Sequence, residues 1–334
     1  MLSSKKINVG ISIGDPNGIG IEIILKVLSE SYLYEECNFV IYSSLELIAS
    51  QQKFFNIKTL PLKTINSFED ISSDCINIKE VFSSAKYEFG KKDKVVSSNC
   101  ITSFKEAVND AKLKKIDILI TAPINKELSY SSSFKFLGHT DYLKNIFNID
   151  PMMLMVSDNF KLGLLTEHTP LKDVLNEISK DKVIEKIKTL RATLIKDFQI
   201  KDPKIAILAI NPHVGDNGVI GSEDQNILIP AIKYFNKNTD LIFGPYSADT
   251  FFCNDNYKKY DGIIAAYHDQ GLIPFKIISF GKGVNYSSGL PIIRTSPDHG
   301  TGFDIAGKGI ASATSFKHAL ILGLDIYRSR KTID

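Results

Sequence analysis

Short apolar runs of strand length alternate along the chain with longer stretches in which apolar residues recur at helical spacing. The runs that predict strands lie at residues 7–13, 38–43, 116–123, 152–157, 161–168, 204–211, 241–245 and 262–268. The stretches that predict helices lie at 19–30, 99–115, 171–179, 181–198, 224–236 and 312–329. Strands that alternate with helices indicate an α/β fold with a largely parallel sheet.

Three histidines come at the ends of predicted strands, where ligands bind in parallel sheets. They are His168, His213 and His268. If the sheet brings these strand ends together, three neutral imidazoles converge, a set that suits Zn, Co or Ni and leaves open positions for a substrate oxygen. For any one of them, the alternative is an ordinary hydrogen-bonded loop histidine. Asp269 is a carboxylate that can fix the orientation of an imidazole.

A second group of polar residues lies in the stretch FLGHTDYL, residues 136–143. Gly138, His139 and Thr140 precede a helical stretch at 141–147, so backbone N–H groups, a hydroxyl and an imidazole gather at a helix start. Such a place can bind an anion. The alternative is an ordinary helix N-cap, with Thr140 as the capping residue.

Three more polar residues, Lys276, Asn285 and Arg294, fall within a short part of the chain. Surface positions are the default interpretation for lysine and arginine. Arg294 follows the apolar run GLPII, however, which indicates a guanidinium aimed into a cleft, where it can hold a carboxylate or phosphate. An internal salt bridge with an acid such as Asp298 is the alternative.

Two glycine-rich stretches differ in what they indicate. GDPNGIG at 14–20 lacks the spacing of a dinucleotide fingerprint or a P-loop, so tight-turn packing explains it at least as well as phosphate binding. HGTGFDIAGKG at 299–309 combines glycines, an acid and an apolar pair just before the last predicted helix. That combination suits a loop folded around a flat ligand.

Composition excludes several classes of protein. The chain has 334 residues, 43% hydrophobic and 23% charged, which fits a soluble globular protein of two domains or one large one. A net charge of +2 indicates neither nucleic acid nor an anionic membrane as partner. No apolar run approaches the roughly 20 residues that span a bilayer, and the first residues contain no signal-peptide h-region. Four scattered cysteines suggest reduced thiols, so we expect a cytoplasmic protein.

Taken together, the motifs resemble one family, 4-hydroxythreonine-4-phosphate dehydrogenase of the pyridoxal phosphate pathway. The resemblance covers nearly the whole chain and rests on GDPNGIG, GHTDYL, TEHTPL, NPHVGD, GPYSADT, YHDQGLIPFK and GVNYSSGLPIIRTSPDHGTGFDIAGKG, in this order. The loop at 299–309 also resembles the adenosine-binding loop of isopropylmalate and isocitrate dehydrogenases. The resemblance implies two α/β domains with mostly parallel sheets, flanking helices and an interdomain cleft. The first domain is expected at 1–128 plus 303–334, and the second at 129–302.

The resemblance also assigns roles to residues. It implies metal ligands at His168, His213 and His268. It implies substrate contacts from His139, Thr140, Lys276, Asn285 and Arg294. It places NAD or NADP at the 299–309 loop, through His299, Gly300, Asp304 and Ile305, and it leaves Lys276 or Asp249 as the base. A homodimer is expected, with the active site at the subunit interface and the metal site completed by both subunits.

The reaction that the resemblance implies is an oxidation of 4-phosphooxy-L-threonine at C3 by NAD, followed by decarboxylation to 3-amino-2-oxopropyl phosphate. It depends on one divalent metal ion, Zn, Co or Mg. A dehydrogenase of a four-carbon sugar acid phosphate, such as threonate or erythronate 4-phosphate, would keep every motif. A zinc-dependent hydrolase would not need NAD and leaves the 299–309 loop unexplained. A non-catalytic phosphometabolite-binding protein gives no reason for three histidine ligands.

Overall fold

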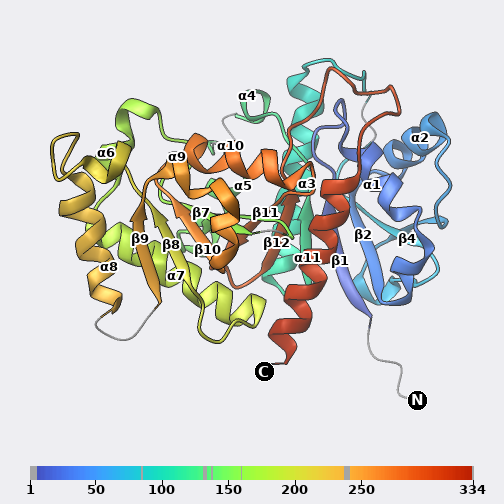
Figure 1. Ribbon diagram of the computed structural model, residues 1–334. Coiled ribbons are helices and arrows are strands. Elements are labelled where there is room, and N and C mark those ends of the chain that lie inside the picture. The colour runs from blue at the N-terminus through green and yellow to red at the C-terminus, as the bar shows by residue number, and fades with distance from the viewer. Residues whose placement is uncertain are drawn as a thin grey trace. The chain divides into compact units, whose positions relative to one another are not determined.

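A computed structural model describes residues 6–83, 86–130, 134–136, 138–158, 160–236 and 241–332. The chain forms two compact units, and each combines strands with helices (Figure 1). Unit 1 consists of Met1–Asn148 and Pro291–Tyr327, and unit 2 of Ile149–Leu290 and Arg328–Asp334. The predicted α/β class is confirmed. The domains expected from the sequence, 1–128 plus 303–334 and 129–302, have limits that differ from those of the two units. They stay a prediction.

Unit 1 contains a fully parallel sheet. Its strands, in spatial order, are β3 (Leu62–Ile65), β4 (Ile76–Glu80), β2 (Cys37–Ser43), β1 (Ile7–Ser12), β5 (Ile118–Thr121) and β12 (Ile293–Pro297). Its helices are α1 (Gly20–Leu28), α2 (Leu45–Phe55), α3 (Lys94–Lys112), α4 (Lys126–Ser129), α5 (His139–Phe147) and most of α11 (Thr314–Lys331). Five of the six residues of β1 are buried, as expected for a strand covered on both faces.

Unit 2 contains a mixed sheet. Its strands, in spatial order, are β11 (Val284–Ser288), β6 (Met152–Val156), β7 (Lys161–Leu164), β10 (Gly262–Ala265), β8 (Ile205–Leu208) and β9 (Ile242–Tyr246). β6 is antiparallel to both β11 and β7, whereas β7, β10, β8 and β9 are parallel to one another. Its α-helices are α6 (Val174–Glu177), α7 (Lys180–Phe198), α8 (Ile229–Asn236), α9 (Ala248–Phe251) and α10 (His268–Ser279).

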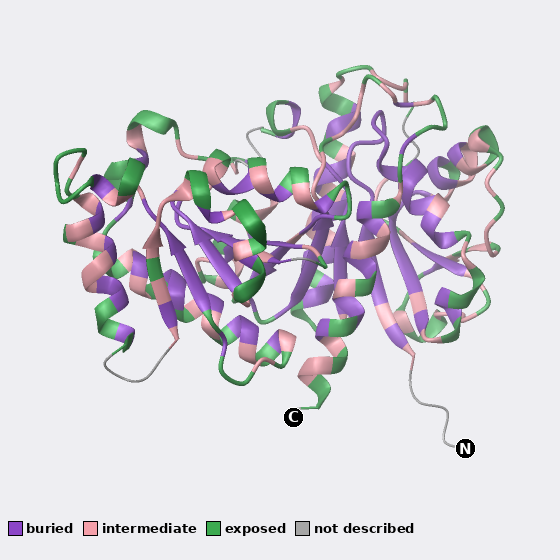
Figure 2. Cartoon of the chain, in the orientation of Figure 1, coloured by how far each residue is buried: buried purple, intermediate pink, exposed green. Residues whose placement is uncertain are grey.

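Short helices of other types connect these elements. They are η1 (Ser31–Glu35), η2 (Phe68–Asp70), η3 (Leu171–Asp173), η4 (Pro212–Gly215), η6 (Cys253–Lys259) and the π-helical turn η5 (Asp224–Leu228). The strands are mostly buried and the outer faces of the helices are exposed (Figure 2). Within the residues that the structure describes, no helix combines the length and the apolar character that crossing a bilayer requires.

Local chemistry explains why the secondary-structure prediction is wrong at two places. α3 begins at Lys94, five residues before the expected start, because the Asp93 carboxylate accepts hydrogen bonds from the N–H groups of Val95 and Val96 and caps the helix. The sequence predicted no helix around Lys276, but this stretch is the helix α10. Pro274 lies inside this helix and hid its pattern.

Candidate functional site

The three predicted metal ligands follow three neighbouring strands of unit 2. β10 pairs in parallel with β7 on one side and with β8 on the other. Because parallel neighbours end at the same edge of the sheet, His168 after β7, His268 after β10 and His213 after β8 leave the sheet at that edge. The condition that the sequence set for a shared site, that the sheet brings these strand ends together, is met.

Two of the three imidazoles are close together. The ring centroids of His168 and His268 lie 5.9 Å apart, a spacing that suits two ligands of one ion with metal–nitrogen bonds of about 2.0–2.1 Å. His268 Nδ1 lies 2.7 Å from an oxygen of Asp269, so the predicted carboxylate contact is confirmed. A carboxylate at Nδ1 fixes the tautomer in which Nε2 carries the lone pair for a metal.

His213 has different surroundings. It lies in η4 with a left-handed backbone (φ 52°), and its side chain is exposed. The Ser247 hydroxyl donates a hydrogen bond to Asp249 at 2.7 Å, which lowers the pKa of the Asp249 carboxyl. Among the described residues, no three His, Cys, Asp or Glu side chains are grouped as a metal site. The structure thus brings together two of the predicted ligands, His168 and His268.

A network that the sequence did not reveal fixes these strand ends. The Gln270 side chain accepts the N–H of Ala266 after β10 and donates to the carbonyl of Ala209 after β8, both at 2.7 Å. The buried Asp224 carboxylate accepts the backbone N–H of Asn211 at 3.0 Å and also the Asn211 side-chain amide. Asp224 stands in a helical pattern and looks like a surface acid, so sequence alone offered no signal for it.

Arg294 lies inside unit 1 as a residue of β12. It is only 2% exposed, and its Nε and Nη2 groups donate to the Thr121 hydroxyl at 3.1 and 2.6 Å. Burial lowers the pKa of the guanidinium to about 9, which still leaves it charged at neutral pH. Asp298, the acid that the sequence offered as an alternative partner for Arg294, accepts a hydrogen bond from the Ser315 hydroxyl at 3.3 Å. Thr121 ends β5 and was not predicted as part of the site.

His139 lies near Arg294. Its Nε2 atom is buried and has no hydrogen-bond partner among the described residues, and its ring stands edge-on to Phe104 with centroids 4.5 Å apart. Burial, and then the charges of Arg294 and Lys126, hold the pKa of His139 well below its usual value. The imidazole is therefore neutral, and its buried nitrogen is available to a ligand.

The start of α5 decides between the two interpretations of Thr140. α5 begins at His139 with Gly138 at the N-cap position, and no side chain caps it. The interpretation of Thr140 as the N-cap is therefore wrong. Thr140 lies in the first turn, half-buried, where its hydroxyl and the unpaired N–H groups of the helix start suit an anion.

The other two predicted substrate residues belong to unit 2. Asn285 lies in β11 opposite Met155 of β6, and its side-chain oxygen is buried with no hydrogen-bond partner in the described part of the chain. Lys276 lies in α10 and is exposed. An orphan buried oxygen marks Asn285 as a place for a ligand donor.

The predicted cofactor loop at 299–309 is built from successive turns before α11. The N–H of Ile305 donates to Gly302, and His299 Nδ1 lies 3.0 Å from the carbonyl oxygen of Gly300. His299 Nε2 is buried and has no partner in the described chain, while Gly300 and Asp304 are exposed. The loop therefore offers a ring nitrogen and open backbone to a ligand.

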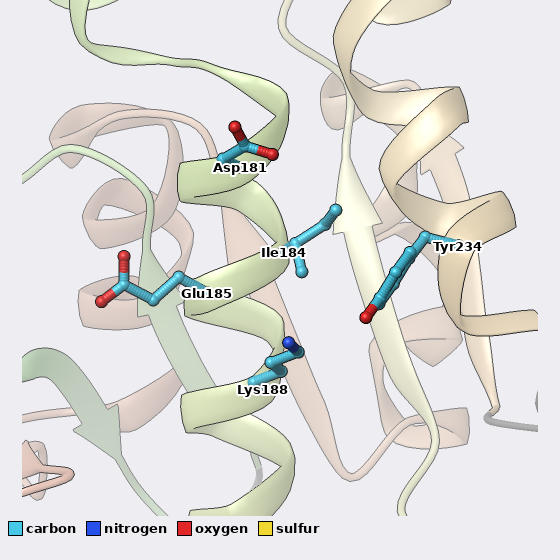
Figure 3. Close-up of a pocket in the computed structure, with 5 residues that line it drawn as sticks. All are labelled: Asp181, Ile184, Glu185, Lys188 and Tyr234. Carbon is cyan, nitrogen blue, oxygen red and sulfur yellow. The ribbon is translucent and has the colours of Figure 1, made fainter.

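A pocket of about 340 Å³ lies elsewhere in unit 2. Figure 3 shows its lining, which comes from α7 (Asp181, Ile184, Glu185 and Lys188) and from Tyr234 of α8. The Lys188 ammonium stands 5.5 Å from the centre of the Tyr234 ring. None of the predicted site residues lines this pocket.

Known proteins resemble the chain over nearly its whole length. A 4-hydroxythreonine-4-phosphate dehydrogenase of Bacteroides thetaiotaomicron is 37% identical over 99% of this chain and 91% of its own. A protein of Clostridium botulinum, provisionally named a D-threonate 4-phosphate dehydrogenase, is 32% identical over 96% of this chain and 97% of its own. The structure of the 4-hydroxythreonine-4-phosphate dehydrogenase of Klebsiella pneumoniae superposes with a TM-score of 0.83, 29% identity and coverage of 97% and 98%.

A more distant likeness concerns the fold alone. An isocitrate dehydrogenase of Methylococcus capsulatus superposes with a TM-score of 0.51 at 12% identity, over 97% of this chain and 87% of its own. This confirms the predicted similarity to that fold class. Residues 35–323 match the family model described as pyridoxal phosphate biosynthetic protein PdxA. The chain therefore belongs to the PdxA family of dehydrogenases in pyridoxal phosphate biosynthesis.

Proposed function

We propose that the protein oxidises 4-phosphooxy-L-threonine at C3 with NAD or NADP and then releases CO2 to form 3-amino-2-oxopropyl phosphate, a step towards pyridoxine 5′-phosphate. The C3 hydride goes to the nicotinamide and the hydroxyl proton goes to a base. The observation that carries the proposal is the set of three histidines at the ends of adjacent parallel strands, in a chain of the PdxA family. A hydride transfer and a β-keto acid decarboxylation both benefit from a polarised C3 oxygen.

The histidines would hold one divalent metal, Zn, Co or Mg. His168 and His268 fit two ligand positions by their 5.9 Å spacing and by the Asp269 contact, and we assign His213 as the third ligand. A bound divalent metal lowers the pKa of a coordinated hydroxyl and stabilises negative charge on a carbonyl oxygen.

Residues of the chain would orient the substrate and move the proton. Arg294 suits a carboxylate or phosphate, because a guanidinium matches two oxygens at once. His139, Thr140 and Asn285 offer hydrogen bonds to the remaining polar groups. Asp249 and Lys276 both stay candidates for the base. The lowered pKa of the Asp249 carboxyl keeps this group ionised and able to accept a proton, but makes it a weaker base.

The 299–309 loop would bind the dinucleotide through His299, Gly300, Asp304 and Ile305. Support comes from the unpartnered buried His299 nitrogen and from the resemblance of this loop to adenosine-binding loops. A hydrolase or a simple binding protein would leave this loop without a role. The membership in a dehydrogenase family also disfavours both.

We further propose that two copies form a homodimer in the cytoplasm and complete the active site together. α10 carries His268 and Lys276, and it exposes Ile273, Ile277 and Phe280 by 59%, 65% and 86% at helical spacing. An exposed apolar face on the helix that carries site residues suits a subunit contact. None of the four cysteines forms a disulfide, which suits a reducing compartment. Sedimentation of an active monomer would contradict the dimer.

A second substrate has a specific observation in its favour. The Clostridium botulinum relative carries the name of a D-threonate 4-phosphate dehydrogenase, so threonate or erythronate 4-phosphate is the alternative substrate. We would measure reduced nicotinamide formation with each of the three phosphates, with NAD and with NADP. We expect kcat/KM to be highest for 4-phosphooxy-L-threonine. A higher value for threonate phosphate would replace the assignment, and no reduction with any of them would reject the dehydrogenase reaction.

A further inference from the structure

The motif GDPNGIG at 14–20 has no role in the proposed reaction, yet it contacts the start of the loop at 299–311. The N–H of Ile19, at the beginning of α1, donates to the carbonyl of Thr301 over 2.9 Å. Gly18 has no space for a side chain, because a Cβ there would lie 2.6 Å from the same carbonyl oxygen. The first turn of α1 therefore fixes the beginning of this loop.

An ion pair on α1, between the buried Glu22 and the half-buried Lys26, contacts the end of the same loop. The Lys26 ammonium donates to the carbonyls of Gly309 and Ala311 at 2.9 and 2.7 Å. It also pairs at 2.7 Å with Glu22, one helical turn earlier. The fully buried Glu22 carboxylate accepts the N–H of Ala311 at 2.9 Å. One face of α1 thus binds both ends of the loop, which runs from β12 to α11 (Figure 1).

A third contact supports the loop through a neighbouring segment. The Asn17 side chain accepts the N–H of Glu88 and donates to the carbonyl of Lys91, each at 2.8 Å. Gly90, within this segment, lies so close to the loop that a Cβ would come 2.8 Å from the Phe303 carbonyl oxygen. The motif and α1 therefore hold the loop at its ends and from one side.

Stability alone does not account for this arrangement. The second carboxylate oxygen of Glu22 is buried with no hydrogen-bond partner among the described residues, and the cost of removing a carboxylate from water often cancels the free energy that its ion pair contributes. Part of the loop is open to a ligand, since a Cβ at Gly300 would meet nothing within 4 Å and Asp304 is exposed. A loop that is fixed at Thr301 and Ala311 and exposed at Gly300 and Asp304 is suited to bind a ligand with little further ordering.

We propose that Glu22 and Lys26 are positioning residues that hold the 299–311 loop in the conformation that binds a dinucleotide. The inference rests on the proposed function, which assigns NAD or NADP to this loop. A loop that is ordered beforehand loses less conformational entropy on binding, so the pair raises dinucleotide affinity. It acts through the backbone of Gly309 and Ala311, so it does not change which atoms react.

The test compares substitutions of two lysines, each of which pairs with a buried carboxylate. Lys26→Met removes the loop contacts. Lys79→Met is the control, because Lys79 pairs with the buried Asp110, and its side chain is 24% exposed against 30% for Lys26. We would measure NAD and NADH dissociation constants by calorimetry, and unfolding by urea. Both variants should lose stability, but only Lys26→Met should bind the dinucleotides roughly ten-fold more weakly.

The remaining outcomes separate the inference from the function on which it rests. If the unmodified protein binds neither NAD nor NADP, the proposed function fails. If it binds one of them and Lys26→Met binds that dinucleotide equally well, the proposal that Glu22 and Lys26 position the loop is rejected. Lys26→Arg keeps the charge and the donors and should restore most of the affinity. Glu22→Gln serves in place of Lys26→Met if that variant does not fold, with weaker binding expected again and unchanged binding decisive against the proposal.

Discussion

The polar groups of the two units differ in how far the fold has already fixed them. In unit 1, Arg294 is almost completely buried with two hydrogen bonds to Thr121, and the buried nitrogen of His139 lies nearby. In unit 2, His168 and His213 are exposed at the ends of their strands. Burying a charge is unfavourable unless its surroundings compensate, so the unit 1 groups stay in place only because their neighbours hold them.

This difference indicates whether the residues of each unit control metal binding or the orientation of the substrate. A side chain that is held before the ligand arrives orients the ligand, and its loss reduces alignment. An exposed imidazole takes its final geometry from the ion it binds, and its loss removes the ion. We therefore expect substitutions in unit 2 to change metal content, and substitutions in unit 1 to change kinetics at constant metal content.

The largest effect is expected for His213→Ala. Loss of one imidazole from a site of three should remove the metal and lower turnover roughly 1,000-fold, because a metal contributes several kcal/mol to stabilising charge in the transition state. Elemental analysis and reduced nicotinamide formation measure the two properties. NAD binding should stay largely intact. His318→Ala is the control, since the hydrogen bond of His318 is to the Thr314 carbonyl, one helical turn away in α11. A His213→Ala enzyme with normal metal and rate would show that His213 is not a ligand.

A smaller effect is expected for Asp269→Asn. The amide keeps the size of the side chain but removes the negative charge 2.7 Å from His268 Nδ1. Partners of this kind set metal affinity, so the dissociation constant for the metal should rise about 10–100-fold. A competition titration with a chelator measures it. If the affinity for the metal does not change, Asp269 does not orient His268 as a metal ligand.

A further prediction concerns Arg294→Lys. The variant keeps the charge but loses the paired geometry, so kcat/KM should fall roughly ten-fold or more, since one charge-assisted bond contributes about 1.5–3 kcal/mol. Metal content should stay the same. Arg330→Lys is the control, because Arg330 is a half-buried arginine paired with the buried Asp197 at 2.7 Å. It should lose stability without a change in kinetics. A destabilised but fully active Arg294→Lys enzyme would reject the substrate role.

The sequence predicted the part of the site that depends on local pattern. Apolar runs followed by histidines marked three strand ends, and the structure shows that these strands are neighbours. The GLPII run set Arg294 apart from an ordinary surface arginine, and its side chain is buried in the structure. The strands could be predicted because apolar runs show which segments of the chain avoid water.

The rest depends on contacts between residues far apart in the chain. Thr121 meets Arg294 across 173 positions, and Lys26 meets Ala311 across 285. Nothing near Thr121 or Lys26 in the sequence signals these partners. The helix α10 was missed because Pro274 interrupts its pattern, and the antiparallel pairing of β6 with β11 was missed because strand direction is not encoded in an apolar run.

The smallest effect tests whether His139 is as buried as its surroundings indicate. Its folded-state pKa lies well below the value near 6.5 of an unfolded chain. Above pH ~6.5 both states carry a neutral imidazole, and the free energy of unfolding has no contribution from its titration. As the pH falls below that value, His139 binds a proton in the unfolded state but not in the folded state. Its contribution therefore decreases the free energy of unfolding by up to about 1.4 kcal/mol per pH unit.

His139→Gln removes this contribution, so the stability of the variant should fall less steeply than that of the unmodified protein between pH ~6.5 and ~5. Urea unfolding at a series of pH values measures both slopes, and the carboxyl groups that also titrate there cancel in the difference. His318→Gln controls for the loss of an imidazole at an exposed position. Equal slopes for the unmodified protein and His139→Gln would mean that His139 protonates as easily in the folded state as in the unfolded chain. The contrast between a fixed unit 1 and an adaptable unit 2 would then rest on Arg294 alone.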